Sequence, residues 1–203
     1  MTATTTATTT PPQTHDVAGR DRILREAAQL FLDRGYAETS MRTIAGAADV
    51  RPASIYHHFS SKDTLLAEIL SIGMDAVTHA FAEAAAVAAT SPRARLEAHV
   101  AAHLHALFAH HAFTAAHVTV FPFAPVSVRR AAVAERDQYE SQWTALLLEV
   151  APHMTSEATR VVRLALFGAM NSTVHWFDAA EGSVDDLAEA IVQTLWDGLG
   201  ATP

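Results

Sequence analysis

Residues 39–62 constrain the fold of this chain more than any other stretch, because they read as two short helices joined by a tight turn. Ser40 is placed to cap the first helix. Asp49 falls at the turn, where it tolerates a left-handed backbone better than most residues do. Pro52 opens the second helix, where its missing N–H costs nothing.

The second of these helices has one apolar side. Ile55 and Phe59 lie four residues apart and face inward, which leaves small, hydroxyl and aromatic side chains facing outward. A short helix that presents such groups and is held by an apolar inner face has the geometry of a helix-turn-helix. We therefore predict this motif over about residues 40–59.

The same residues carry a family resemblance. They follow the pattern Thr39-x-x-x-x-Ile44-Ala45-x-x-Ala48-x-Val50 and then Ser54-Ile55-Tyr56-His57-His58-Phe59-x-x-Lys62. This pattern resembles the DNA-binding head of the TetR family of transcriptional regulators, and the resemblance covers roughly residues 20–70. Two positions depart from the family, which usually has Gly where Asp49 stands and Ser or a similar cap where Arg51 stands.

The resemblance implies roles for single residues. Arg42 matches a position that reads a base or a phosphate, and an Arg offers a bidentate donor fork to guanine. Arg51 replaces the usual cap and adds a cation beside DNA. The other DNA-contacting residues that we expect are the base-facing Pro52, Ala53 and Ser54, the phosphate-binding Tyr56, His57 and Lys62, and the neighbouring Ser40 and Thr43.

Composition and charge agree with an all-α protein that meets DNA at one end. Half of the 203 residues are hydrophobic, and Ala predominates over β-branched residues, as in helical proteins. The net charge is −8. Residues 16–62 carry seven basic and six acidic side chains, whereas the rest of the chain carries seven and 16. The acidic remainder would be repelled by phosphate, so only the head is expected to contact DNA.

The chain divides into three parts. We expect a disordered, Thr-rich tail over residues 1–15, a DNA-binding domain over 16–62 and an effector-binding and dimerisation domain over 63–203. Apart from the helix-turn-helix, helices are predicted over about 19–34, from Lys62 onward, from Pro92 to about His110, over about 113–120, 127–150 and 155–177, and after Ser183, with a loop over 121–125.

The last two predicted helices carry more apolar surface than one chain of this length can bury. The segment 161–170 is apolar nearly all round, so it needs a cover on both sides. A thick core within one chain is one interpretation. A four-helix bundle between two chains is the other, and the resemblance implies it. The interface residues that we predict are Phe167, His175, Ile191, Leu195 and Trp196.

Twelve His residues form the second unusual feature of the sequence. His99, His103, His110 and His117 would share one side of a continuous helix, and the first two have the spacing of a metal-binding pair. Surface or hydrogen-bonded His, a ligand pocket and a metal site are the three interpretations. The pocket residues that we predict, which describe an ordinary core equally well, are His103, Leu107, Phe121, Tyr139, Trp143, Phe167 and Asn171.

Other function classes find little support in the sequence. There is no Cys, no Gly-x-Ser-x-Gly, no His-Glu-x-x-His and no Gly-rich phosphate loop, so we expect no enzyme and no cofactor. The first 15 residues do not resemble a signal peptide, and we expect a soluble, cytoplasmic protein. The function we predict is a dimeric repressor that a small, apolar organic effector releases from a palindromic double-stranded DNA operator. The alternatives are a metal sensor using His99 and His103, and a DNA-binding protein without a ligand.

Overall fold

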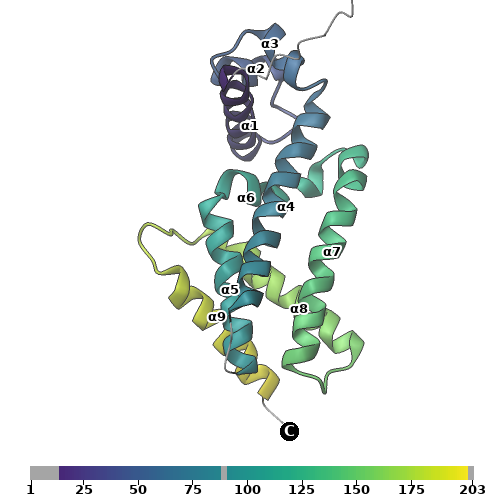
Figure 1. The fold of residues 1–203 in the computed structure, drawn as a ribbon, viewed down its shortest axis with the longest axis vertical. Helices are drawn as coiled ribbons and strands as arrows, with labels where there is room; N and C mark the ends of the chain where they lie inside the picture. The colour runs from purple at the N-terminus through teal and green to yellow at the C-terminus, as the bar shows by residue number, and fades with distance from the viewer. Residues whose placement is uncertain (1–13, 88–90, 201–203) are drawn as a thin grey trace, which may run out of the picture.

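The structure is a computed structural model that describes residues 14–87 and 91–200. Within this part of the chain every regular element is helical (Figure 1). The elements are α1 (Thr14–Arg34), α2 (Met41–Ala47), α3 (Pro52–His58), α4 (Lys62–Ala86), α5 (Pro92–Ala109), α6 (His111–Thr119), η1 (Phe121–Phe123), α7 (Val126–Val150), α8 (Ser156–Ser172), η2 (Thr173–His175) and α9 (Val184–Gly200). The all-α fold is confirmed.

The molecule is elongated, with a small head and a larger body (Figure 1). Helices α1 to α3 form the head at one end. The long helix α4 starts beside them and runs through the body, where α5 and α7 lie on its two sides. The predicted division into a head and a body therefore has a structural counterpart, although the predicted tail lies almost entirely outside the described residues. Helix α1 begins at Thr14, inside that predicted tail.

The head has the turn chemistry that its sequence predicts. The Ser40 hydroxyl accepts a hydrogen bond from the backbone N–H of Thr43 at 3.1 Å and so caps α2. Asp49 has φ of 49° at the turn between α2 and α3, in the left-handed region. Gly35 has φ of 81° just after α1, where a residue without Cβ is least strained. The helix-turn-helix is confirmed.

The core of the head continues into the body. Ile44 and Ile55 are fully buried in the head, as the apolar spacing predicts. The same cluster of buried side chains includes Phe121 and Val128 of the body. Head and body thus share one apolar core at their junction, and a displacement on the body side of this junction is transmitted to the head by direct packing.

Helix α4 connects the two parts. It begins with a capping box in which Ser61 and Thr64 satisfy each other's backbone N–H groups. Its first half contributes Leu65 and Ile69 to the junction core, and its second half contributes Val77 and Phe81 to the core of the body. By length and composition alone this helix is apolar enough to cross a membrane. Here its apolar side chains form the centre of a globular fold.

Two predictions about the body need correction. The segment 121–125 is not all loop, because Phe121–Phe123 form a 3₁₀ turn that closes with a hydrogen bond from the Ala124 N–H to the Phe121 carbonyl. Helix α8 ends at Ser172, earlier than predicted, and continues as the 3₁₀ turn Thr173–His175. Asn, Ser and Thr at this end are weaker helix formers than Leu or Ala, which accounts for the early end.

Helix α8 is covered on one side only. Leu166 and Met170 are buried against the body, whereas Val161 and Leu164 are 53% and 49% exposed. Helix α9 packs its apolar stripe inward, with Ala188 and Val192 buried. The prediction that segment 161–170 has more apolar surface than one chain covers therefore agrees with the described residues.

Candidate functional site

The first candidate site is the outer surface of α2 and α3 in the head. The prediction placed ten DNA-contacting residues there, and most of these side chains are exposed. Tyr56 is 58% exposed although it is aromatic, and His57 beside it is also exposed. Arg42 and Arg51 are exposed, and their guanidinium groups form no hydrogen bond or ion pair with any other described residue. Two exposed guanidinium groups and an exposed aromatic ring on these two helices are suited to contact with a DNA backbone and its bases.

Three of the ten residues also serve the head itself. The Ser40 hydroxyl caps α2 and lies 2.8 Å from the Thr43 hydroxyl, so both groups already have a local partner. The Lys62 ammonium donates to the carbonyl oxygens of Tyr36 at 2.7 Å and Thr39 at 2.8 Å. It also lies 4.1 Å from the centre of the Tyr36 ring. Lys62 therefore holds the connection between α1 and α2, and a phosphate would have to share it.

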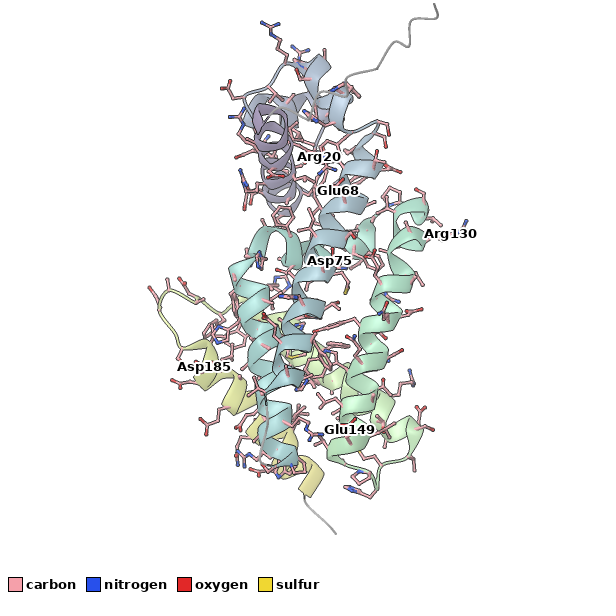
Figure 2. The ribbon with its side chains drawn as sticks, viewed as in Figure 1. Arg20, Glu68, Asp75, Arg130, Glu149 and Asp185 are labelled. Atoms are coloured by element: carbon pink, nitrogen blue, oxygen red, sulfur yellow. The ribbon has the colours of Figure 1, made fainter. Side chains whose placement is uncertain are left out.

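An ion pair and a hydrogen-bond relay fix the head on α4. Arg20 of α1 and Glu68 of α4 lie side by side in Figure 2 and pair at 2.5 Å. Asp63 accepts a short hydrogen bond from the Tyr36 hydroxyl and another from the Ser127 hydroxyl of α7 at 3.1 Å. These contacts connect the head, the start of α4 and the start of α7, so the orientation of the head depends on the position of the body helices.

The second candidate site is a cavity of about 220 Å³ inside the body. Helices α4 to α8 all contribute to its wall. The lining residues are Gly73, Met74, Val77, His103, Leu107, Thr114, His117, Val118, Arg136, Tyr139, Glu140, Leu164, Phe167 and Asn171. The cavity therefore touches both the helix that leads to the head and α6, which packs against the head.

Five of the seven predicted pocket residues line this cavity: His103, Leu107, Tyr139, Phe167 and Asn171. The other two lie elsewhere. Phe121 belongs to the junction core between head and body. Trp143 is fully buried behind the lining, and its ring centre is 6.2 Å from that of His103. Sequence spacing identified an aromatic core but did not distinguish lining residues from the layer behind them.

The polar centre of the cavity is a hydrogen-bonded group of three side chains. The amide oxygen of Asn171 accepts from Nε2–H of His103 at 3.3 Å, and Nδ1 of His103 accepts from the Tyr139 hydroxyl at 2.8 Å. Burial lowers the pKa of His103 to about 4, against an opposing effect of the Asn171 hydrogen bond. Burial also raises the pKa of Tyr139. All three groups are therefore neutral at physiological pH.

The cavity also has a charged edge that the sequence analysis did not single out. Arg136 and Glu140 both line it, and the Glu140 carboxylate pairs with Arg163 of α8. The spacing of Arg136 and Glu140, four residues apart on one helix, was the available signal. The guanidinium of Arg136 lies 5.5 Å from the centre of the Phe121 ring, so this edge contacts the junction core.

The α6 side of the cavity is absent from the predicted pocket residues, although His117 belongs to the His stripe for which a ligand pocket was one interpretation. Nε2 of His117 lies 2.6 Å from the carbonyl oxygen of Leu70 on α4. Burial lowers the pKa of His117, although this hydrogen bond acts in the opposite direction. Gly73 allows the close crossing, because a Cβ built there would lie 2.5 Å from the carbonyl oxygen of Phe113. Helices α4 and α6 thus meet in a tight contact beside the cavity.

The structure gives the His99–His103 pair no arrangement for a metal ion. Nδ1–H of His99 donates to the Arg95 carbonyl oxygen at 2.8 Å, and both nitrogens of His103 have protein partners. Among residues 14–87 and 91–200 there is no group of three or more His, Asp or Glu side chains suited to a metal ion. His110 lies exposed between α5 and α6, where the predicted helix break is found.

A helix-turn-helix head on a helical body with an internal cavity defines a DNA-binding transcriptional regulator. Two family models match the chain. "Bacterial regulatory proteins, tetR family" matches residues 23–69, and "Tetracyclin repressor-like, C-terminal domain" matches residues 89–199. The second match alone spans more than half of the chain.

Individual proteins agree with the family models. The HTH-type transcriptional repressor KstR2 of Rhodococcus jostii is 30% identical over 202 residues, which cover 95% of this chain and 98% of that protein. A TetR-family transcriptional regulator from Bordetella parapertussis has a similar structure, with a TM-score of 0.80 and 28% identity over 88% of this chain and 94% of that one. PfmR from Thermus thermophilus has a TM-score of 0.75 and 26% identity, with 93% and 96% covered.

The chain belongs to the TetR family of transcriptional regulators. It is a DNA-binding regulator and not an enzyme.

Proposed function

We propose that this protein is a dimeric repressor that leaves a palindromic operator when a small, largely apolar organic effector enters the body cavity. The observation that carries this proposal is the buried group of His103, Tyr139 and Asn171 in a cavity whose wall includes α4 and α6. Repression is supported by the relative KstR2, which is named a transcriptional repressor and aligns with nearly the whole chain.

The chemistry of the cavity supports an apolar effector with one polar group. Most of its wall is apolar, and the three neutral side chains of its polar centre offer a hydroxyl, an imidazole and an amide. Such groups orient a carbonyl or hydroxyl oxygen and do not neutralise a multiply charged anion. A charged carrier would remain near Arg136 at the cavity edge. A structural neighbour of the same fold, AibR, is described in complex with isovaleryl coenzyme A and operator DNA, which pairs an apolar acyl group with a charged carrier.

The route from the cavity to the head supports the effect on DNA. His117 lines the cavity and hydrogen-bonds α4, and Arg136 lines it and contacts the junction core through Phe121. An effector that separates α6 and α7 from α4 moves the head. A coupling free energy of about 1–3 kcal/mol between the two sites changes DNA affinity by about 5–150-fold.

The exposed side of α8 supports a dimer. Val161 and Leu164 are about half exposed, Leu164 also lining the cavity, and nothing lies within 4 Å of a Cβ built at Gly168. A second copy of α8 can therefore approach closely along this side, with α9 beside it. Of the predicted interface residues, Phe167 faces the cavity, His175 is exposed, and Ile191, Leu195 and Trp196 are partly buried in the body core. Two heads must be separated by about 34 Å, or a multiple of one helical turn, to reach successive major grooves.

The experiment starts with selection of the operator from random duplex DNA by the purified protein. Fluorescence anisotropy then measures binding to the selected palindrome and its decrease with salt. A thermal-shift screen compares lipophilic metabolites with zinc and nickel, each with and without a chelator, since a ligand of the native state raises its melting temperature. Organic hits that lower DNA affinity, and that fail to stabilise the His103→Leu variant, support the proposal. Stabilisation by metals alone contradicts it.

A further inference from the structure

A second hollow lies at the end of the body that is distant from the head. It is a cleft of about 590 Å³ between the end of α4, the start of α5 and the end of α7, and we call it the distal cleft. Glu149, labelled on the lower part of α7 in Figure 2, marks its position. Its lining residues are Phe81, Ala84, Ala85, Ala86, Val87, Arg95, His99, Gln142, Ala145, Leu146 and Glu149.

One layer of aromatic rings separates the distal cleft from the cavity around His103, Tyr139 and Asn171, which we call the effector cavity. Phe81 and His99 line the cleft with ring centres 4.4 Å apart, and both pack against the buried Trp143 at 5.3 and 6.3 Å. Across the layer, the ring centre of Phe81 is 6.0 Å from that of Tyr139, which lines the cavity. The three rings come from three different helices, α4, α5 and α7.

The effector cavity is small by comparison. Its volume of about 220 Å³ falls below the roughly 300–1,000 Å³ of ordinary ligand pockets, whereas the distal cleft falls within that range. An effector of ordinary size therefore needs more space than the cavity offers. The adjoining cleft supplies it once the aromatic side chains of the layer change rotamer.

We propose that the distal cleft is a second compartment of the effector site. It accepts the far end of an elongated apolar molecule whose first end is held by His103, Tyr139 and Asn171. This inference rests on the proposed function of the cavity. It adds that the effector is long rather than compact, and that it displaces the layer formed by Phe81, His99 and Trp143.

The polar groups of the cleft indicate what the far end carries. Nδ1–H of His99 donates to the Arg95 carbonyl, so the other ring nitrogen of the neutral imidazole is an acceptor. The amide oxygen of Gln142 is buried and has no hydrogen-bond partner among the described residues. Arg95 and Glu149 neutralise each other at 2.8 Å. Two acceptors beside a neutralised ion pair favour a hydroxyl or another neutral donor at the end of the molecule.

Occupation of the cleft would also act on the head. Phe81 belongs to α4, which begins in the head at Lys62. A ligand that pushes the Phe81 ring aside acts on the distal part of this helix, while the cavity contacts its middle at Gly73 and Val77. A long ligand therefore contacts the head-bearing helix over more turns than a short one.

A series of alkane diols of increasing length, each with a hydroxyl at both ends, tests the proposal. Hexane-1,6-diol, nonane-1,9-diol and dodecane-1,12-diol are titrated calorimetrically into the full chain at constant cosolvent. Each additional methylene that leaves water contributes about fourfold in affinity. We expect this increase to persist up to the longest diol, because its second half enters the distal cleft.

Substitutions that fill the cleft locate the binding. Ala85→Trp and Ala145→Trp place a large ring in it from opposite walls at exposed positions, and Ala82→Trp is the matched control on the same exposed helix surface outside the cleft lining. Both cleft variants should bind hexane-1,6-diol as the unmodified protein does and lose the gain for the long diols. The control should keep that gain.

Two other outcomes would overturn the proposal, and they are distinguishable. If hexane-1,6-diol binds but affinity stops rising with length, or rises equally in both cleft variants, the second compartment does not exist. If no diol binds to the unmodified protein, the cavity itself fails as an effector site, and the inference fails with it.

Discussion

Nε2–H of His117 donates to the backbone carbonyl oxygen of Leu70 at 2.6 Å, and this contact joins the cavity to the helix that holds the head. His117 lines the cavity on α6, and Leu70 belongs to the core shared by head and body. The hydrogen bond is partly buried, and its loss leaves the half-buried imidazole without its partner on α4. We expect effectors to act through this contact.

Replacement of His117 by Phe tests the coupling. The ring volume is largely kept while the hydrogen bond to Leu70 is lost. Effector affinity in the absence of DNA should change little, and the effector-induced loss of DNA affinity should fall by about 1 kcal/mol or more. Anisotropy titrations at several effector concentrations measure both. The exposed His110→Phe is the control, and full release by effector in His117→Phe would show that the coupling runs elsewhere.

The buried His103 predicts a dependence of stability on pH. Its folded pKa of about 4 lies below the ordinary value of 6.5, so the unfolded chain binds the extra proton first as the pH falls. The free energy of unfolding should decrease from pH 6.5 towards pH 4 by about 3 kcal/mol from this group alone. Burial lowers the pKa values of His99 and His117 too, and they add to the loss with the same sign.

Urea denaturation at a series of pH values measures this loss. The matched variant is His103→Gln, which keeps a neutral polar side chain without a titrating ring. Its stability should depend less on pH over the same range. An equal slope in both proteins would place the titrating groups elsewhere.

Gly168 offers a direct test of the dimer. Nothing lies within 4 Å of a Cβ built there, so a large side chain fits the isolated chain. Gly168→Trp should therefore keep the helical content and convert the dimer to a monomer, because the partner helix can no longer approach. Light scattering gives the mass against 21.8 kDa for one chain. The exposed Ala134→Trp on α7 is the control, and a dimeric Gly168→Trp protein would place the interface away from α8.

Substitutions in the head should separate DNA contact from head stability. Arg42→Ala and Tyr56→Ala remove exposed groups, so DNA affinity should fall while the melting temperature stays within a degree or two. Arg42→Ala should also relax the sequence preference. Lys62→Met should lower stability instead, by about 1–3 kcal/mol, because the carbonyl oxygens of Tyr36 and Thr39 lose a charged donor. If Lys62→Met is as stable as the unmodified protein, the two carbonyl contacts do not stabilise the head, and phosphate binding is the only role left for Lys62.

Replacement by Ala should change the free energy of unfolding in opposite directions at two helical glycines. At Gly73 the added Cβ would meet the Phe113 carbonyl oxygen at 2.5 Å, so Gly73→Ala forces α6 away from α4 and should cost about 1–3 kcal/mol. At Gly46 nothing lies within 4 Å, and Gly46→Ala should stabilise α2 by about 0.5–1 kcal/mol. Denaturation curves compare the pair. A stabilised Gly73→Ala protein would contradict the tight crossing.

Local signals in the sequence were sufficient to predict the structure of the head and the starts of most helices. Ser40, Asp49 and Pro52 act through hydrogen bonds and backbone angles within a few residues, and all three are found as predicted. Ser61 and Ser91 likewise cap the helices that follow them. Such features are readable because their energies depend on neighbours in the chain rather than on the fold.

For the functional surfaces too, the sequence predicted local features but not the contacts between segments that are distant in the chain. Apolar spacing predicted which side chains of the body are buried, yet it could not place Trp143 behind the cavity or Phe121 at the junction with the head. Nor could it pair Lys62, a predicted phosphate contact, with carbonyls more than 20 residues away, which give the same ammonium a structural role as well.

The sequence by itself determined the helix-turn-helix, the all-α class and the family, because capping, periodicity and motif spacing are properties of short segments. The tertiary structure alone decided which polar groups meet. His103 contacts Tyr139 and Asn171 across 36 and 68 residues of chain, and His117 reaches Leu70 across 47. These contacts depend on how α4 to α8 cross one another, and the crossing geometry is set by the packing of whole helix surfaces. Gly73 is one example, because the close crossing of α4 and α6 requires a residue without a Cβ there.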